Sequence, residues 1–335
     1  MAGRRTNLAL MALLIVALTT GGLAYAIGTR VVAIVVVAHG IAGLAIVLLS
    51  PWKVAIARRG IQRRRPGREI SLLLAGLVVV CVVTGLVHAS GLLVVQGSFS
   101  PLGIHVATSL AAVAVGVAHV VQRPVRPRVT DLSRRTVLRT GVLAVAAGAA
   151  FAGFGGLLRA GGARGADRRF TGSHETGSFQ PSSMPVTQWL DDAVPAVDAS
   201  TWRLQISGGN LVTRSITIDD LAVFDDRVRA TLDCTGGWFA EQGWRGVWLD
   251  RLIGDARGAS VRIRSATGYA RRFPIGDVAN VLVATHVGGE ALSAGHGFPA
   301  RLVVPGRRGF WWVKWVVEVR VDDTPWWWQP PFPLT

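Results

Sequence analysis

The chain has 335 residues, half of them hydrophobic, and a formal net charge of +16 at pH 7. Its length allows two or three domains, and its positive mean hydropathy is unusual for a soluble protein. Acidic and basic residues nearly balance over positions 170–335, so the positive excess lies in residues 1–169, among long apolar runs. This distribution argues against a nucleic-acid partner and favours a membrane topology signal.

Five apolar runs are long enough to cross a bilayer, which needs about 20 residues. They lie at residues 8–27, 31–49, 70–90, 101–121 and 137–158. None contains Asp, Glu or Lys, and Arg139 stands at the edge of the last run. Buried helices of a soluble protein are the alternative, but core helices are seldom this long and this apolar. We therefore expect a bundle of five transmembrane helices in contact with lipid.

Lys and Arg residues are concentrated on one side of these runs. Arg4 and Arg5 precede the first run, and further basic residues fill the stretches 52–69 and 122–139. Because cytoplasmic loops carry the excess of Lys and Arg, the amino terminus is expected in the cytoplasm. Five spans then place residues 160–335 outside, although four arginines just after the last run argue against this. We predict a multi-pass protein of the cytoplasmic membrane with an extracytoplasmic carboxy-terminal part.

The approach to the fifth run is distinctive. Residues 132–139 read LSRRTVLR and resemble a twin-arginine export signal, with an Ala/Gly-rich apolar stretch at 141–156. That route exports folded domains, often with a cofactor installed. Ordinary cytoplasmic-side arginines are the alternative. Because no small-residue cleavage site stands out, we expect the helix to be retained as an anchor.

These boundaries divide the chain into three parts. A four-helix membrane domain covers residues 1–125, the twin-arginine-like segment and fifth helix cover 126–160, and the extracytoplasmic domain covers 161–335. The last part holds short β-rich segments bounded by Gly, Pro and Asp, and two short helical segments. The strands are expected at 202–207, 215–218, 230–233, 260–265, 300–304 and 314–321, and the helices at 218–221 and 247–253. We predict an α+β, β-rich fold for this domain.

The chain has two cysteines. Cys81 lies in the third apolar run and Cys234 in the outer domain, so they are not expected to reach one another in a disulfide. A single free cysteine is unusual in an oxidising compartment, which suggests that it has a function. The open choices are a buried inert thiol, an intermolecular disulfide or a metal ligand.

Three ordered motifs in the outer domain narrow this choice. Residues 230–238 read ATLDCTGGW, residues 296–301 read HGFPAR and residues 309–315 read GFWWVKW. Glycines after Cys234 let the backbone approach a bulky ligand closely, and a thiolate suits a soft metal. Together, over about residues 170–322, the motifs resemble the sulfite oxidase family of molybdopterin oxidoreductases. That family includes sulfite oxidase, assimilatory nitrate reductase and the catalytic subunit of the periplasmic methionine-sulfoxide reductase.

The resemblance implies roles for individual residues. Cys234 stands at the place of the protein's sulfur ligand to molybdenum, and Gly236 belongs to the same cofactor-binding motif. His296, Arg301 and Lys314 are expected to contact the pterin and its phosphate. Arginine offers a planar fork to phosphate oxygens and lysine a point charge, which agrees with this assignment. Backbone amides between Gly306 and Gly309 would add an anion-binding turn.

Each of these side chains could also have an ordinary structural role. His296 would otherwise be a turn residue, Arg301 a salt-bridge partner and Lys314 a surface strand residue. Tyr269 resembles the tyrosine that family members place near the metal and is a candidate catalytic residue. A tyrosine between strands is more commonly a packing residue with its hydroxyl satisfied.

Four histidines fall in or at the ends of the apolar runs, namely His39, His88, His105 and His119. Ionisable groups inside a membrane are costly and suggest function. The spacing of His105 and His119 resembles helices of membrane cytochromes b, but His119 has no histidine partner at its own depth. We therefore expect one outer haem b whose iron takes two of His39, His88 and His105, most naturally His105 with either His39 or His88. Interfacial placement, hydrogen bonding between helices and quinone binding are the alternatives.

The sequence thus predicts a membrane-bound molybdopterin-dependent oxidoreductase. It would transfer an oxygen atom to or from a small sulfite-, sulfoxide- or N-oxide-type substrate and exchange electrons with quinone or another membrane redox partner. A catalytically inactive, membrane-anchored binding or scaffold module on the same fold is the alternative. Basic residues near the metal would favour sulfite, and Arg245, Arg271 and Arg272 are the candidates. An aromatic funnel would favour a sulfoxide or an N-oxide, and Trp238 and Trp244 are the candidates for it.

Overall fold

A computed structural model describes residues 2–62, 67–95, 99–190 and 192–333 of the chain. Arg63, Arg64 and Arg65 of the basic stretch lie outside the described residues. The chain separates into two compact units. The first comprises Met1–Tyr25 and Arg30–His174, and the second comprises Ala26–Thr29 and Glu175–Thr335.

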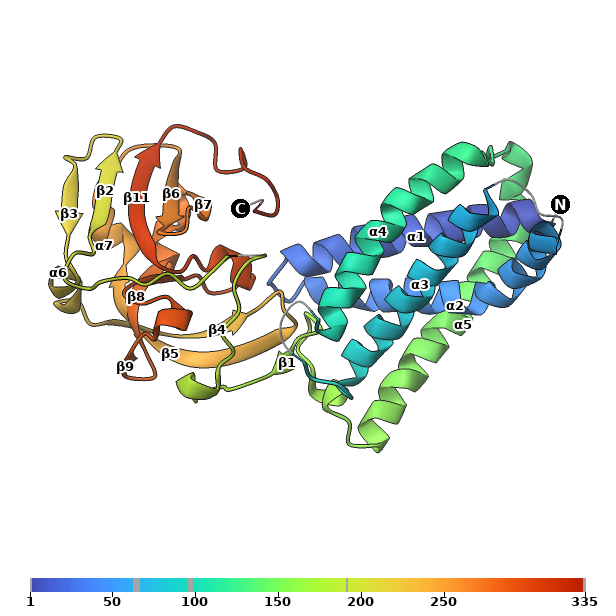
Figure 1. Cartoon of the computed structure of the whole chain (residues 1–335), viewed down its shortest axis with the longest axis horizontal. Coiled ribbons are helices and arrows are strands. Elements are labelled where there is room, and N and C mark those ends of the chain that lie inside the picture. Colours follow the sequence, from blue (N-terminus) through green and yellow to red (C-terminus); the bar gives the residue numbers. More distant parts are fainter. Residues whose placement is uncertain (1, 63–66, 96–98, 191, 334–335) are drawn as a thin grey trace. The chain divides into compact units, whose positions relative to one another are not determined.

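The first unit is helical (Figure 1). Its long helices are α1 (Ala2–Ala26), α2 (Val32–Gln62), α3 (Arg68–Ser90), α4 (Pro101–Gln122) and α5 (Arg134–Ala160). Within the described residues, these five are long and apolar enough to cross a membrane. Each overlaps one of the predicted runs. Two 3₁₀ turns, η1 (Val129–Leu132) and η2 (Arg164–Asp167), flank α5.

Local chemistry explains where these helices begin and end. The hydroxyl of Ser100 accepts a hydrogen bond from the Gly103 N–H, and Pro101 occupies the first helical position of α4. Ser133 caps α5 in the same way, accepting from the Thr136 N–H. Gly91 ends α3 with a φ of 67°, which a residue with a Cβ adopts only at a cost.

The predicted second span is shorter than the helix that contains it. The apolar run ends at residue 49, whereas α2 continues through Pro51 to Gln62. Proline removes the donor that would bond to the Val47 carbonyl, but the helix continues through residues such as Lys53, Ala55 and Ala57, which favour helices. Part of the predicted cytoplasmic loop is therefore helical.

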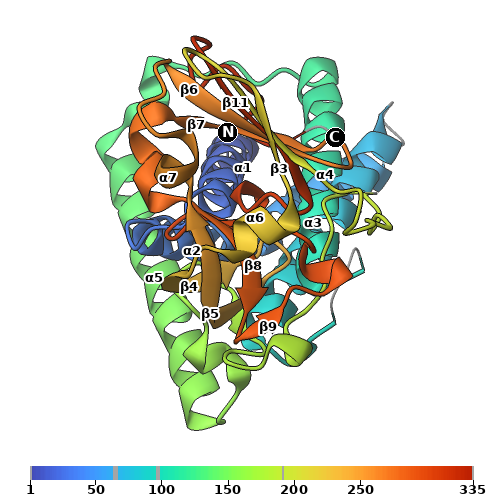
Figure 2. The ribbon, with the colours of Figure 1, turned by 90° about the vertical axis from the view of Figure 1, so that its left-hand side faces the viewer.

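The second unit contains two β-sheets, seen separately in Figure 2. One has the order β5-β8-β10, with β4 beside β5 and β9 beside β8, and the other has the order β3-β2-β11-β6-β7. Strand β11 is parallel to β2 and antiparallel to β6. The strand bounds are β1 His174–Glu175, β2 Leu204–Gly208, β3 Arg214–Ile216, β4 Asp226–Asp233, β5 Trp238–Trp248, β6 Ser260–Ser265, β7 Ala270–Pro274, β8 Leu282–Val287, β9 Glu290–Ala291, β10 Arg301–Val303 and β11 Val316–Asp322.

Short helices connect these strands. They are α6 (Ile218–Ala222), α7 (Leu249–Ile253), η3 (Pro181–Ser183), η4 (Ile275–Asn280), η5 (Ala294–His296) and η6 (Gly309–Trp311). The predicted β-rich α+β class is confirmed for this unit. The predicted strands overlap β2, β3, β4, β6, β10 and β11, whereas β1, β5, β7, β8 and β9 were not predicted.

Alternating strand residues build the core of the second unit. Leu204 and Ile206 of β2 are fully buried, while Gln205 between them is exposed. Val261 and Ile263 of β6 follow the same alternation. Burying each such side chain contributes about 1.5–3 kcal/mol, so the alternation fixes which face of each strand points inward.

Candidate active site

Cys234 lies in a tight turn between two paired strands. β4 ends at Asp233 and β5 begins at Trp238. The Cys234 N–H donates to the Trp238 carbonyl at 2.9 Å, and the Gly237 N–H donates to the Cys234 carbonyl at 3.1 Å. Gly237 has a φ of 87°, which explains why a glycine is needed there. The Gly236 N–H lies 3.3 Å from the Cys234 sulfur and donates to it.

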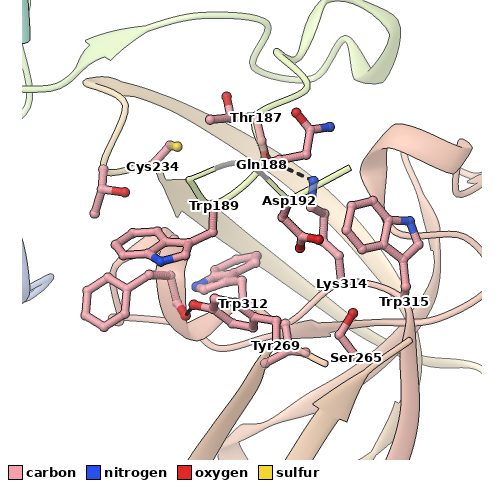
Figure 3. A pocket seen from close by; sticks show the side chains of 14 residues that line it. Thr187, Gln188, Trp189, Asp192, Cys234, Ser265, Tyr269, Trp312, Lys314 and Trp315 are labelled. Atoms are coloured by element: carbon pink, nitrogen blue, oxygen red, sulfur yellow. Dashed lines mark hydrogen bonds between the residues drawn. The ribbon is translucent and has the colours of Figure 1, made fainter. Parts of the chain in front are cut away.

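The thiol of Cys234 lines a pocket with about 470 Å³ of space not filled by protein atoms. That figure includes open solvent, and the cavity itself is about 70 Å³. Much of the wall is aromatic, and polar groups from several segments complete it (Figure 3). The aromatic residues are Trp189, Tyr269, Phe310, Trp312 and Trp315, and the polar side chains include Thr187, Gln188, Asp192, Ser265 and Lys314.

Tyr269 belongs to the aromatic wall. Its hydroxyl donates to the backbone carbonyl of Phe310. Trp189 packs beside both residues, with ring centroids 6.4 Å from Tyr269 and 5.9 Å from Phe310. The structure thus brings Tyr269 to the same pocket as Cys234, with its hydroxyl satisfied by the protein.

Two buried cations lie at this site. Arg301 is 3% exposed, donates to the His296 carbonyl at 3.0 Å and stacks over the Trp244 ring at 5.1 Å. Lys314 donates to the carbonyls of Thr187 at 2.9 Å and Gly295 at 3.0 Å. Within the described part of the chain, neither forms an ion pair with a carboxylate.

Burial disfavours the charge on both groups. Loss of solvation lowers the pKa of Arg301 to about 9. Loss of solvation, and then the charge of Arg301, lower the pKa of Lys314 to about 7. Unpaired buried cations are costly, and a bound anion would offset that cost. The pair is therefore suited to a phosphate.

A buried ion pair holds the cysteine turn in place. Arg308 pairs with Asp233, both side chains being nearly inaccessible to solvent, and its Nη2 donates to the Cys234 carbonyl at 3.2 Å. Burial raises the pKa of the Cys234 thiol, while the Gly236 N–H and Arg308 oppose that rise. Gly309 approaches the turn so closely that an added Cβ would lie 3.0 Å from the Cys234 Cα.

His296 lies beside the pocket, and its ring nitrogens are already bonded within the protein. Its Nδ1 is 2.9 Å from the Ser293 hydroxyl and its Nε2 is 3.0 Å from the Met184 carbonyl. Its backbone carbonyl, in turn, accepts from Arg301. A direct contact between the His296 ring and a cofactor stays a prediction.

The residues suggested for substrate selection lie away from the pocket lining. Arg245 is 3.9 Å from the exposed Asp225, and Arg272 pairs with Asp322. Arg271 is buried over the Trp311 ring at 4.2 Å. Trp244 is a core residue, and the Trp238 Nε1 donates to the Thr187 hydroxyl at 3.1 Å. Lys314 is the cation that lines the pocket among the described residues.

Sequence reasoning missed part of the wall. Trp189 and Asp192 come from an irregular segment with no motif, and nothing in the sequence brings that segment to Cys234. Arg308 stood in the predicted anion-binding turn, but its pairing with Asp233 depends on the fold. The chain's end also contributes, because the Trp189 Nε1 donates to the Pro333 carbonyl at 3.0 Å.

These features fit a molybdopterin. The Cys234 thiol and the Lys314 ammonium line one pocket with a largely aromatic wall, and Arg301 is buried close to Lys314. Cys234 would hold the metal, and Arg301 and Lys314 would hold the phosphate.

The candidate haem ligands lie in the first unit. His39 of α2 and His105 of α4 have ring centroids 5.8 Å apart. His88, near the end of α3, packs against His174 with centroids 5.1 Å apart. The Nδ1 of His119 lies 3.3 Å from the Ser71 hydroxyl. His174 had not been singled out in the sequence.

Comparison with known proteins assigns the second unit. Residues 191–328 match the oxidoreductase molybdopterin binding domain. The chain is 30% identical to rat (Rattus norvegicus) mitochondrial sulfite oxidase over 167 residues, covering 39% of this chain and 31% of that protein. It is 28% identical to the nitrate reductase [NAD(P)H] of Hordeum vulgare over 170 residues, covering 38% and 19%. The chain therefore spans less than a third of either protein.

A solved structure is also similar. The sulfane dehydrogenase SoxCD from Paracoccus pantotrophus is 29% identical, with a TM-score of 0.37, over 39% of this chain and 40% of that chain.

The second unit is accordingly a molybdopterin-binding oxidoreductase domain. It is similar in sequence to sulfite oxidase and nitrate reductase, the resemblance that its three motifs predicted. The cytochrome b-like character of the first unit stays a prediction.

Proposed function

We propose that the chain is a membrane-bound, molybdopterin-dependent oxidoreductase that transfers one oxygen atom to or from a small sulfite-, sulfoxide- or N-oxide-type substrate. The observation that carries this proposal is the meeting of Cys234 and Lys314 in one pocket, with Arg301 buried beside it. When bound, the molybdenum would supply a two-electron redox centre.

The chain's own residues would bind and orient the cofactor and shield it from water. Cys234 supplies the thiolate, and the glycine at 236 aims an N–H at that sulfur. Arg301 and Lys314 neutralise the phosphate, with His296 fixing Arg301 through its carbonyl. Tyr269 and Trp189 exclude water on the aromatic side. The Tyr269 hydroxyl donates to the Phe310 carbonyl. A substrate oxygen would compete with that carbonyl for the same hydrogen bond.

The reaction balances with a two-electron carrier. Oxidation joins an oxygen atom from water to a substrate lone pair and releases two protons and two electrons, whereas reduction runs the same exchange backwards. A membrane quinone takes up or supplies both electrons and both protons. Lipid and this carrier are therefore the proposed partners beside the substrate.

The membrane location rests on five apolar helices and on charge. In our proposal α1 to α5 span the cytoplasmic membrane and the second unit lies outside the cytoplasm. The twin-arginine-like segment 132–139 directs its export, and α5 remains as the anchor. A haem b bound by membrane histidines, with His39, His88 and His105 as candidates, carries electrons between quinone and the second unit.

Metal and pterin analysis of the full chain, purified in detergent after expression with cofactor supply, tests the enzyme. We expect about one molybdenum and one phosphorylated pterin per chain, because enclosed sites hold metal tightly. Cys234→Ser should lower turnover more than about 100-fold, since even residues behind a metal ligand change activity by 10–100-fold. A chain with under about a tenth of a molybdenum would support the scaffold alternative.

A further inference from the structure

The hydrogen bonds of the membrane-domain histidines divide them into two groups. The Nδ1 of His39 lies 2.9 Å from the Ala17 carbonyl, and the Nδ1 of His105 lies 2.7 Å from the Cys81 carbonyl. A carbonyl only accepts, so Nδ1 carries the proton in both rings. Neither Nε2 has a hydrogen bond within the described part of the chain, so each ring is left with a free lone pair on Nε2.

This arrangement is the one that metal-binding histidines use. Such a histidine usually donates its other ring N–H to a backbone carbonyl, which fixes the tautomer and the ring orientation. The 5.8 Å between the His39 and His105 centroids is also suitable. With metal–nitrogen bonds of about 2 Å, two imidazoles on opposite sides of one iron have centroids roughly 6 Å apart.

Glycines on the neighbouring helices give both rings their place. A Cβ at Gly21 of α1 would lie 3.0 Å from the His39 Cε1. A Cβ at Gly85 of α3 would lie 2.9 Å from the His105 Nδ1. Any larger residue at either position would displace the ring. In both helix pairs, a glycine on one helix leaves the space that an imidazole of the other helix occupies.

The apolar residues of the helices around these rings stay partly exposed. No residue in the apolar windows of α1, α3 or α4 is buried. Contact with lipid accounts for exposure on the outer faces, but a tightly packed bundle would bury its inward stripes. A flat, largely apolar group bound by His39 and His105 would cover these inward faces.

His88 is engaged differently. Its ring packs against His174, and its carbonyl accepts from the His174 Nε2 at 2.7 Å. Arg168 donates to the next carbonyl, that of Ala89, at 2.5 Å. These groups satisfy the last carbonyls of α3, where the helix dipole favours a cation. His88 thus belongs to a helix end, and 5.1 Å between its ring and that of His174 is short for a shared iron.

We propose that His39 and His105 are the two axial ligands of a single b-type haem in the first unit, and that His88 and His174 close the end of α3 without binding iron. This inference rests on the proposed function, because it names the ligands of that proposal's electron carrier. A haem held by these two residues would supply a one-electron carrier, so two one-electron transfers would serve each two-electron turnover.

Four matched variants of the full chain test this assignment. His39→Ala, His105→Ala, His88→Ala and His119→Ala are each purified in detergent after expression with added haem precursor. Haem per chain is measured from the pyridine haemochrome, and molybdenum is measured in the same samples. We expect about one haem per chain in the wild type, a loss of about tenfold or more in the first two variants, and full content in the other two.

Imidazole rescue separates ligand loss from misfolding. In His39→Gly or His105→Gly, added imidazole should restore haem content and the low-spin spectrum, because it fills the cavity that the side chain leaves. Loss of haem in His88→Ala with retention in His39→Ala would overturn the assignment. Wild-type protein with full molybdenum and no haem would overturn it as well while leaving the molybdenum enzyme intact, whereas absence of molybdenum alone would count against the proposed function.

Discussion

The residues around Cys234 carry charge where little solvent reaches. Arg301 and Lys314 are suited to an anion, whereas Arg308 already has one in Asp233. The three motifs identified Cys234, Arg301 and Lys314 from the sequence, because each stands in a short, ordered pattern. Arg308 and Asp192 could not be assigned in this way, since their partners are set by the pairing of distant segments.

Lys314 should make the stability of the cofactor-free protein depend on pH. Its folded pKa of about 7 lies below the ordinary value of 10.5, so the unfolded chain binds more protons between these values. Stability should therefore rise as pH increases from 7 towards 10, measured as the melting temperature of cofactor-free full chain in detergent. Lys314→Met should lose this rise, whereas the control Arg320→Met on exposed strand surface should keep it. A rise of equal size in Lys314→Met would contradict the burial argument.

Asp233→Ala should destabilise the second unit. Removing one partner of a buried ion pair leaves the other charge uncompensated, at a cost of about 3–5 kcal/mol. Arg308 is the charge left behind, at 2% exposure. Denaturant unfolding measures the change, and Asp225→Ala, which removes an exposed carboxylate, is the matched control with an expected effect below about 1 kcal/mol. Equal effects of the two substitutions would show that the pair does not hold the turn.

At the scale of elements, regular segments were easier to predict than the walls of the site. Twenty-residue apolar runs specify membrane-length helices, and Ser100 and Ser133 mark where two of them begin. Strand β5 escaped prediction because Gly243 and Gly246 interrupt its pattern. The structure explains Gly246, since β5 has a register shift between Arg245 and Gly246 and a Cβ there would overlap the backbone of β8.

The carboxy-terminal segment braces the aromatic wall of the pocket. Phe332 packs on Phe310 with ring centroids 5.6 Å apart, and Arg271 donates to the Pro330 carbonyl at 3.1 Å. Phe332→Ala should destabilise the second unit by about 1 kcal/mol, as expected for an aromatic pair, in a thermal or denaturant unfolding assay. Trp327→Ala is the control, because that ring is 61% exposed. A larger effect at Trp327 than at Phe332 would refute the bracing role.

At the scale of the whole molecule, the proposed membrane topology rests on the distribution of Lys and Arg residues. In the proposed orientation the carboxy terminus lies outside the cytoplasm. A reporter enzyme that is active only after export should therefore be active when fused at residue 335, and a reporter that needs the cytoplasm should be inactive there. A control fusion in the basic 52–69 stretch should give the reverse pattern. Cytoplasmic activity at residue 335 would overturn the orientation.

The division into two units could be predicted from the sequence, but its exact boundary could not. Hydropathy separated the helical part from the β-rich part, with a predicted boundary at 160 and an observed one at His174–Glu175. The difference arises because η2 and the segment up to His174 pack back on the end of α3 through Arg168 and His174. Polar segments of this kind carry no periodic signal, so only the fold assigns them.

The central claim is a bond between the Cys234 sulfur and molybdenum. X-ray absorption at the molybdenum edge, on the purified full chain and on Cys234→Ser, tests it directly. The account predicts one sulfur neighbour fewer around the metal in the variant, with the pterin content unchanged. An identical set of sulfur neighbours in both proteins would contradict it.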